Sequence, residues 1–85
     1  MKVWHFTYQH PDGYNCALFT TEELALDEAI KLIKSCLPDN ERKCERIYPG
    51  LLKLLDNNAY GAIDLFSDKS CDQSIEVTEM EVISE

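Results

Sequence analysis

The chain has 85 residues, which is enough for one domain with one hydrophobic core. Hydrophobic residues make up 45% of it and charged residues 28%, a balance that is typical of a globular domain and excludes a disordered chain. The formal net charge is −8, so the chain repels nucleic acids and anionic membranes and attracts basic partners. We expect a single domain over residues 1–85.

The first expected element is a β-hairpin. Two segments rich in aromatic and β-branched residues, Lys2–His10 and Tyr14–Thr20, flank a Pro-Asp-Gly sequence at positions 11–13. These residues fit a three-residue loop with Gly in the left-handed bulge position. Such a loop places His5 and Cys16 on opposite faces of the hairpin. It gives this core face: Trp4, Phe6, Tyr8, Tyr14, Cys16 and Leu18.

Two helices are expected in the middle of the chain. Thr20 and Glu23 form a capping-box pattern, apolar residues follow at spacings of three and four, and Pro38 ends this first helix at Leu37. The polar segment at 39–46 predicts a loop or a short helical turn. Pro49 suits the first turn of a second helix that ends at 57–58.

Two more strands are expected in the last third of the chain. Ala59–Phe66 is predicted to form the third strand, with Gly61 as its weak point. Ser74–Ile83 is predicted to form the fourth, and a shift in its apolar alternation indicates a β-bulge near Thr78 and Glu79. The expected fold is therefore α+β with the order β-β-α-α-β-β, an antiparallel sheet with the helices packed on one face.

The four cysteines indicate a reducing compartment. Cys16, Cys36, Cys44 and Cys71 show no Cys-x-x-Cys spacing, and the N-terminal residues lack the apolar run of a signal peptide. No apolar run reaches the roughly 20 residues that cross a bilayer. We expect a cytoplasmic protein with four reduced, mostly buried thiols and no bound metal.

No motif predicts catalysis or nucleic-acid binding. A thiol nucleophile needs a nearby base, and the expected hairpin keeps His5 away from Cys16. Glycine-rich phosphate loops are absent, and the bases around Arg42 alternate with acids. We therefore expect a protein that is not an enzyme, uses no cofactor and binds neither nucleic acid nor membranes directly.

The functional clue is the acidic C-terminal segment. Seven acids lie from Asp64 to Glu85 and only Lys69 opposes them, which gives −7 + 1 = −6. We expect a C-terminal hairpin to dock on a basic protein surface, including one that normally holds nucleic acid. The candidate partner-binding residues are Asp64, Asp68, Asp72, Glu76, Glu79 and Glu81.

In size and charge the chain resembles small inhibitor and adaptor proteins, among them acidic proteins of phages and mobile elements that occupy nucleic-acid-binding sites of host enzymes. This resemblance involves no motif. It implies an inhibitor or adaptor that mimics nucleic acid. Two alternatives remain open: a homodimeric structural protein that associates through its sheet face or an edge strand, and a small thiol-dependent enzyme.

Overall fold

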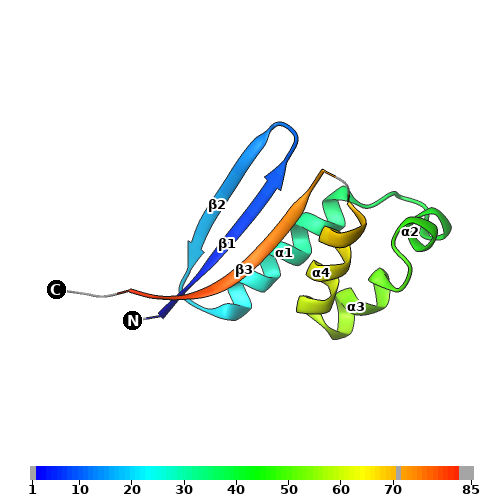
Figure 1. Cartoon of the computed structure of the whole chain (residues 1–85). Helices are drawn as coiled ribbons and strands as arrows, with labels where there is room; N and C mark the ends of the chain where they lie inside the picture. The colour runs from blue at the N-terminus through cyan, green and yellow to red at the C-terminus, as the bar shows by residue number, and fades with distance from the viewer. Residues whose placement is uncertain (1, 71, 83–85) are drawn as a thin grey trace.

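A computed structural model describes residues 2–70 and 72–82 and shows an α+β domain with a three-stranded antiparallel sheet and four helices in these ranges (Figure 1). The α+β class is confirmed, but the expected order of elements is wrong. In chain order the elements are β1 (Lys2–His10), β2 (Gly13–Phe19), α1 (Glu22–Cys36), α2 (Glu41–Ile47), α3 (Leu51–Asn57), α4 (Ala59–Lys69) and β3 (Ser74–Glu81).

The predicted third strand is a helix, α4. Asn58 caps this helix, because its side-chain oxygen accepts a hydrogen bond of 2.9 Å from the Gly61 backbone N–H. Ala62, Ile63 and Phe66 follow at helical spacing and are buried. The apolar run of this segment fits a short strand or a buried helix equally well, and the cap together with burial of that one stripe selects the helix.

The hairpin register differs from the expected one by one residue. Gly13 pairs with His10, so the loop contains two residues, Pro11 and Asp12, and no bulge. Phe6 therefore pairs with Ala17 instead of Leu18. The β1 half of the expected core face is correct, but the β2 half is inverted: Asn15, Ala17 and Phe19 share the face of Phe6, whereas Tyr14, Cys16 and Leu18 lie on the other face.

Burial of Phe19 gives the physical reason for this register. Phe19 packs edge-on against Phe6, with ring centroids 6.4 Å apart and planes at 81°. Leu18, which the expected register buries, is 62% exposed. The larger aromatic side chain is half-buried and packs against the core, and Thr20 and Thr21 connect β2 to α1.

The predicted bulge in the last strand is also absent from β3. Its residues pair one to one with β1, from Ser74 opposite Gln9 to Glu81 opposite Lys2. The sheet order is β2-β1-β3, so β1 is central and the other two strands are edges. Glu79 consequently lies on the same face of the sheet as Phe6, at the end of the strand.

Two helices, α1 and α4, pack against the same face of the sheet, and α3 and α2 lie farther from it (Figure 1). The core joins Phe6 and Ile75 of the sheet to Ile33 of α1 and Phe66 of α4. α1 begins one residue later than expected, because Thr21 caps it, and its last residue is Cys36, before Pro38. Within the described ranges, no helix is long and apolar enough to cross a membrane.

Candidate functional site: the acidic edge

The candidate acids do not form a hairpin. Instead they follow a helix, a loop and an edge strand that lie together: Asp64 and Asp68 on α4, Asp72 before β3, and Glu76, Glu79 and Glu81 on β3. All six residues are exposed. We call these six residues the acidic edge.

Contacts between α4 and β3 bring the acidic edge together. The Ser67 hydroxyl accepts a hydrogen bond of 3.0 Å from the Ile75 backbone N–H and donates one of 3.3 Å to the Ile75 carbonyl. Two turns earlier on α4, Tyr60 lies close enough to Glu79 for its charge to act on the phenol. Since Ser67 meets the start of β3 and Tyr60 its end, α4 runs alongside this edge of the sheet. Asp64 lies on α4 between these two positions.

Tyr60 supports the geometry of this contact. Its hydroxyl donates a hydrogen bond of 3.0 Å to Glu22 Oε2, which ties α4 to the first turn of α1. Burial raises the pKa of Tyr60, and the hydrogen bond to Glu22 and the charges of Glu22 and Glu79 raise it further. The phenol is therefore protonated at neutral pH and holds the helix in place as a donor.

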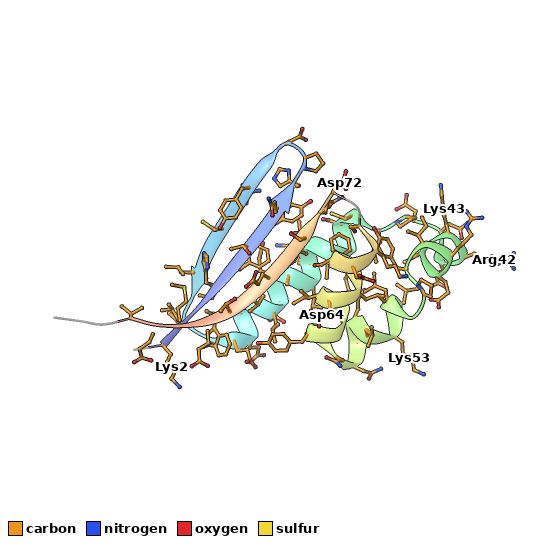
Figure 2. The ribbon with its side chains drawn as sticks, in the orientation of Figure 1. Lys2, Arg42, Lys43, Lys53, Asp64 and Asp72 are labelled. Carbon is orange, nitrogen blue, oxygen red and sulfur yellow. The ribbon has the colours of Figure 1, made fainter. Side chains whose placement is uncertain are left out.

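Few bases oppose the acidic edge. The sequence from Ala59 to Glu81 contains these six acids and one base, Lys69, which gives −6 + 1 = −5. Lys2 reaches Glu79 across the sheet, with 3.2 Å between Nζ and Oε1, in an exposed ion pair that contributes little to stability. Figure 2 shows Arg42 and Lys43 on α2 at one end of the molecule and Lys2 at the other, with Asp64 and Asp72 between them.

The cysteines do not assemble a catalytic site. Among the described residues no hydrogen bond joins a cysteine to a histidine. The expectation of mostly buried thiols is wrong for two of the three described cysteines, since Cys16 and Cys36 are exposed and Cys44 alone is buried. Cys71 lies outside the described residues.

His5 and Cys16 share a face of the sheet, which corrects the expectation that they lie on opposite faces. His5 pairs with Leu18 and Thr7 with Cys16, so His5 and Cys16 are diagonal neighbours, a relation that separates Cα atoms by about 7–8 Å. Both line a hollow of about 480 Å³ on the sheet face that no described helix covers. Ala17, Leu18 and Met80 complete its lining, so it is mostly apolar. The hollow offers no group that would orient His5 as a base.

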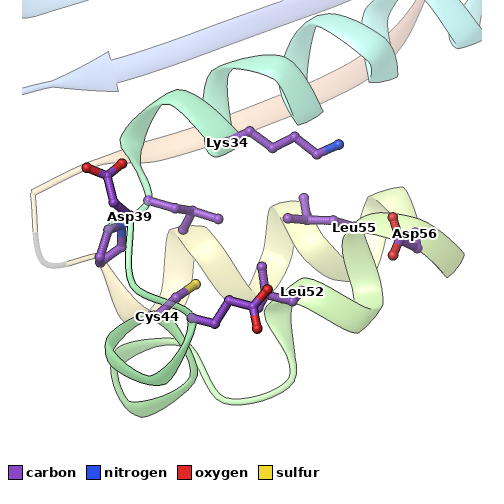
Figure 3. A pocket seen from close by; sticks show the side chains of 9 residues that line it. Lys34, Asp39, Cys44, Leu52, Leu55 and Asp56 are labelled. Carbon is purple, nitrogen blue, oxygen red and sulfur yellow. The ribbon is translucent and has the colours of Figure 1, made fainter.

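Cys44 faces a second hollow, of about 420 Å³, between the end of α1 and helices α2 and α3 (Figure 3). Its floor is apolar and includes Leu52 and Leu55, whereas Lys34, Asp39 and Asp56 supply charges around it. Burial raises the pKa of the Cys44 thiol, and the charges of Glu45 and Glu41 add to this effect. The thiol is protonated at neutral pH and is therefore a poor nucleophile.

Cys36 belongs to a polar cluster around Tyr8. The Tyr8 hydroxyl donates a hydrogen bond of 2.6 Å to Gln73 Oε1 and lies 4.0 Å from Cys36 Sγ. Burial raises the pKa of Tyr8, followed by the hydrogen bond with Cys36 and nearby negative charges. Cys36 is the last residue of α1 and is exposed. This cluster ties β1 to the segment before β3.

The described residues contain no group of three or more His, Cys, Asp or Glu side chains placed to hold a metal ion. The chain matches no protein-family model, no curated protein and no solved structure. Reasoning from the sequence missed Ser67 and Tyr60, which place α4 beside β3. Their spacing of seven residues is a helical signal, but Tyr60 lies in the segment predicted to be a strand and Ser67 lies just after its predicted end at Phe66.

Proposed function

We propose that this protein is a small protein-binding module, an inhibitor or adaptor, that docks its acidic edge on a basic protein surface. The supporting observation is that α4 and β3 lie against each other, so that six exposed acids lie on these two elements and the segment between them, with Glu76 on the uncovered face of the sheet and Glu79 and Glu81 on the face of Phe6. A field of one sign speeds the approach of an oppositely charged partner and selects against others.

The proposed partner presents clustered Arg and Lys side chains, as nucleic-acid-binding proteins do. Carboxylates on a helix and a strand accept the same charge-assisted hydrogen bonds from guanidinium groups that phosphates accept. The module would therefore compete with nucleic acid for the partner and act from the cytoplasm without catalysis. Its affinity would be strongly reduced by salt, because the Debye length falls from about 10 Å at 0.1 M to about 3 Å at 1 M.

Quantitative capture of proteins from the native cell tests this proposal. One variant carries Asp64→Asn, Asp68→Asn and Glu76→Gln in the acidic edge. A matched control carries Glu23→Gln, Asp27→Asn and Glu28→Gln on the exposed side of α1. Both variants have the same net charge, −8 + 3 = −5.

We expect the edge variant to lose a basic protein that the unmodified protein and the α1 control both retain. Association of that protein should slow by about tenfold or more in the edge variant at low salt, because charges at an interface act mainly on the association rate. Added double-stranded DNA should release the captured protein if the acidic edge occupies a nucleic-acid site. Equal losses in both variants would mean that net charge alone attracts the partner, and the proposal would then be wrong.

A further inference from the structure

The backbone of β2 presents open hydrogen-bonding groups at the edge of the sheet. The Ile75 backbone bonds Ser67, so its N–H and C=O point away from β1. Tyr8 pairs with Ile75, so the backbone N–H and C=O of Tyr8 point toward β2. The hydrogen bonds between β1 and β2 therefore form at Asn15, which pairs with Tyr8, and at every second residue of β2 counted from Asn15. It follows that the N–H and C=O groups of Tyr14, Cys16 and Leu18 point outward from the sheet.

The β2 edge lacks the features with which natural edge strands prevent association. Its sequence, GYNCALF, contains no charged residue and no proline, and pairing with β1 is regular along its length. Tyr14 is 58% exposed and Leu18 is 62% exposed. The opposite edge differs, because α4 lies beside β3 and three glutamates occupy that strand. Of the two edges of the sheet, β2 is the open one.

The edge is also complementary to itself. Antiparallel pairing of β2 with the same strand of a second copy overlaps all seven residues when Cys16 lies opposite the second copy's Cys16. Outward-pointing backbone groups then meet along the whole strand, and Tyr14 of each copy lies across from Leu18 of the other. Aromatic and aliphatic cross-strand pairs of this kind stabilise a sheet. The exposed apolar side chains around Leu18 in the two copies then form one continuous apolar surface.

The distribution of charge favours this arrangement. A net charge of −8 on each copy opposes association. β2 carries none of this charge, and the acidic edge lies on the far side of the sheet, beyond β1. Joining two copies at β2 therefore keeps the two acidic edges as far apart as the sheet allows.

We propose that two copies of this chain associate through β2 into a continuous six-stranded antiparallel sheet, with a twofold axis at Cys16. The interface is isologous, and both helical layers lie on the same side of the joined sheet. Two seven-residue strands form a small interface, so the dimer is weak and depends on concentration. The proposal does not depend on the acidic edge binding a partner.

Sedimentation over a range of concentrations, under reducing conditions, tests the dimer. We expect a mass that rises from 9.8 kDa toward twice that value. Leu18→Lys places two cations beside the axis and should raise the dissociation constant by about tenfold or more, whereas Thr78→Lys, on the same face but on β3, should change it by less than about twofold. Circular dichroism checks that both variants are folded.

Hydrogen exchange gives a second readout that requires no variant. The amides of Tyr14, Cys16 and Leu18 should exchange rapidly at low concentration and slow down as concentration rises, while those of Asn15 and Ala17 remain protected throughout. A monomer at every concentration would overturn the proposal. The proposal would also be overturned if Thr78→Lys and Leu18→Lys raised the dissociation constant equally and the protection of the β2 amides did not alternate. That result would favour association through the open sheet face.

Discussion

Gly13 adopts a backbone φ of +152°, a conformation that glycine takes without the steric penalty of a Cβ atom. This conformation lets the residue leave the Pro11–Asp12 loop and pair at once with His10. The facing of every later residue in β2 follows from that pairing, because side chains alternate along a strand. Gly13 thus accommodates the register in which Phe19 is directed toward the helices and Leu18 toward solvent.

The register predicts that truncation of Phe6 and truncation of Leu18 change the free energy of unfolding by very different amounts. Phe6→Ala should lower the free energy of unfolding by about 3–5 kcal/mol, because Phe6 is 6% exposed and packs in the core. Leu18→Ala should change it by no more than about 0.5 kcal/mol, as substitutions at exposed sites do. Urea denaturation at low protein concentration measures both values without a contribution from association. A large loss for Leu18→Ala would show that the sheet is paired in the other register.

Between α3 and α4 there is a single residue, Asn58, which serves both helices. Its backbone N–H donates to the Leu54 carbonyl at the end of α3, and its side chain accepts from Gly61 at the start of α4. Gly61 suits this cap, since a Cβ atom there would lie 3.0 Å from the Asn58 side chain. The two helices therefore meet at a corner with no intervening loop.

Removal of this cap should destabilise the fold. Asn58→Ala leaves the Gly61 N–H without its side-chain acceptor and should cost about 0.5–2 kcal/mol of the free energy of unfolding. Asn57→Ala is the matched control, because the Asn57 side chain donates only to the Lys53 carbonyl within α3 and is exposed. Chemical denaturation of the two variants gives the comparison. Equal losses would mean that the cap contributes nothing beyond helix propensity.

Three protonated groups in different parts of the molecule make its stability sensitive to alkaline pH. Burial is the leading cause that raises the pKa of Cys44 above its ordinary value of 9.0 and those of Tyr8 and Tyr60 above 10.0. Above these ordinary values the unfolded chain loses its protons while the native state still holds them. Their contribution to stability is present below the ordinary values and is lost as pH rises toward the folded-state values.

We therefore expect the free energy of unfolding to fall as the pH rises from 9.0, with a steeper fall from 10.0, in urea titrations on the fully reduced protein. Cys44→Ala should remove the part of the slope that begins at the lower value and leave the part due to the tyrosines. Tyr60→Phe should reduce the later part only slightly, because the phenol that donates to Glu22 is 41% exposed and solvent screens its interaction. Stability that does not change over this range would contradict the raised pKa values.

At the scale of the whole molecule, the two edges of the sheet differ in chemistry. β3 carries acids and has α4 beside it, whereas β2 is uncharged and open. If both proposals hold, a dimer joined at β2 presents its two acidic edges at opposite ends. Each copy could then bind a basic partner without hindering the other.

Local pattern was sufficient for several features of this protein. The spacing of apolar residues and Pro38 predicted α1 to within a residue at its start and end, because capping and periodicity depend on neighbours in the chain. Alternation predicted the inward face of β1 through Phe6. The concentration of acids after position 63 was also a property of the sequence alone.

Only the tertiary structure decided the register of β2, the helical state of Ala59–Lys69 and the grouping of the acids along one edge. In β2 both alternating sets contain apolar residues, so the choice depends on whether Phe19 or Leu18 packs against residues far away in the chain. The short apolar run in α4 is likewise compatible with a strand or a helix until its buried stripe meets α1 and the sheet. Such contacts join distant segments, and their free energy is not encoded in any local pattern.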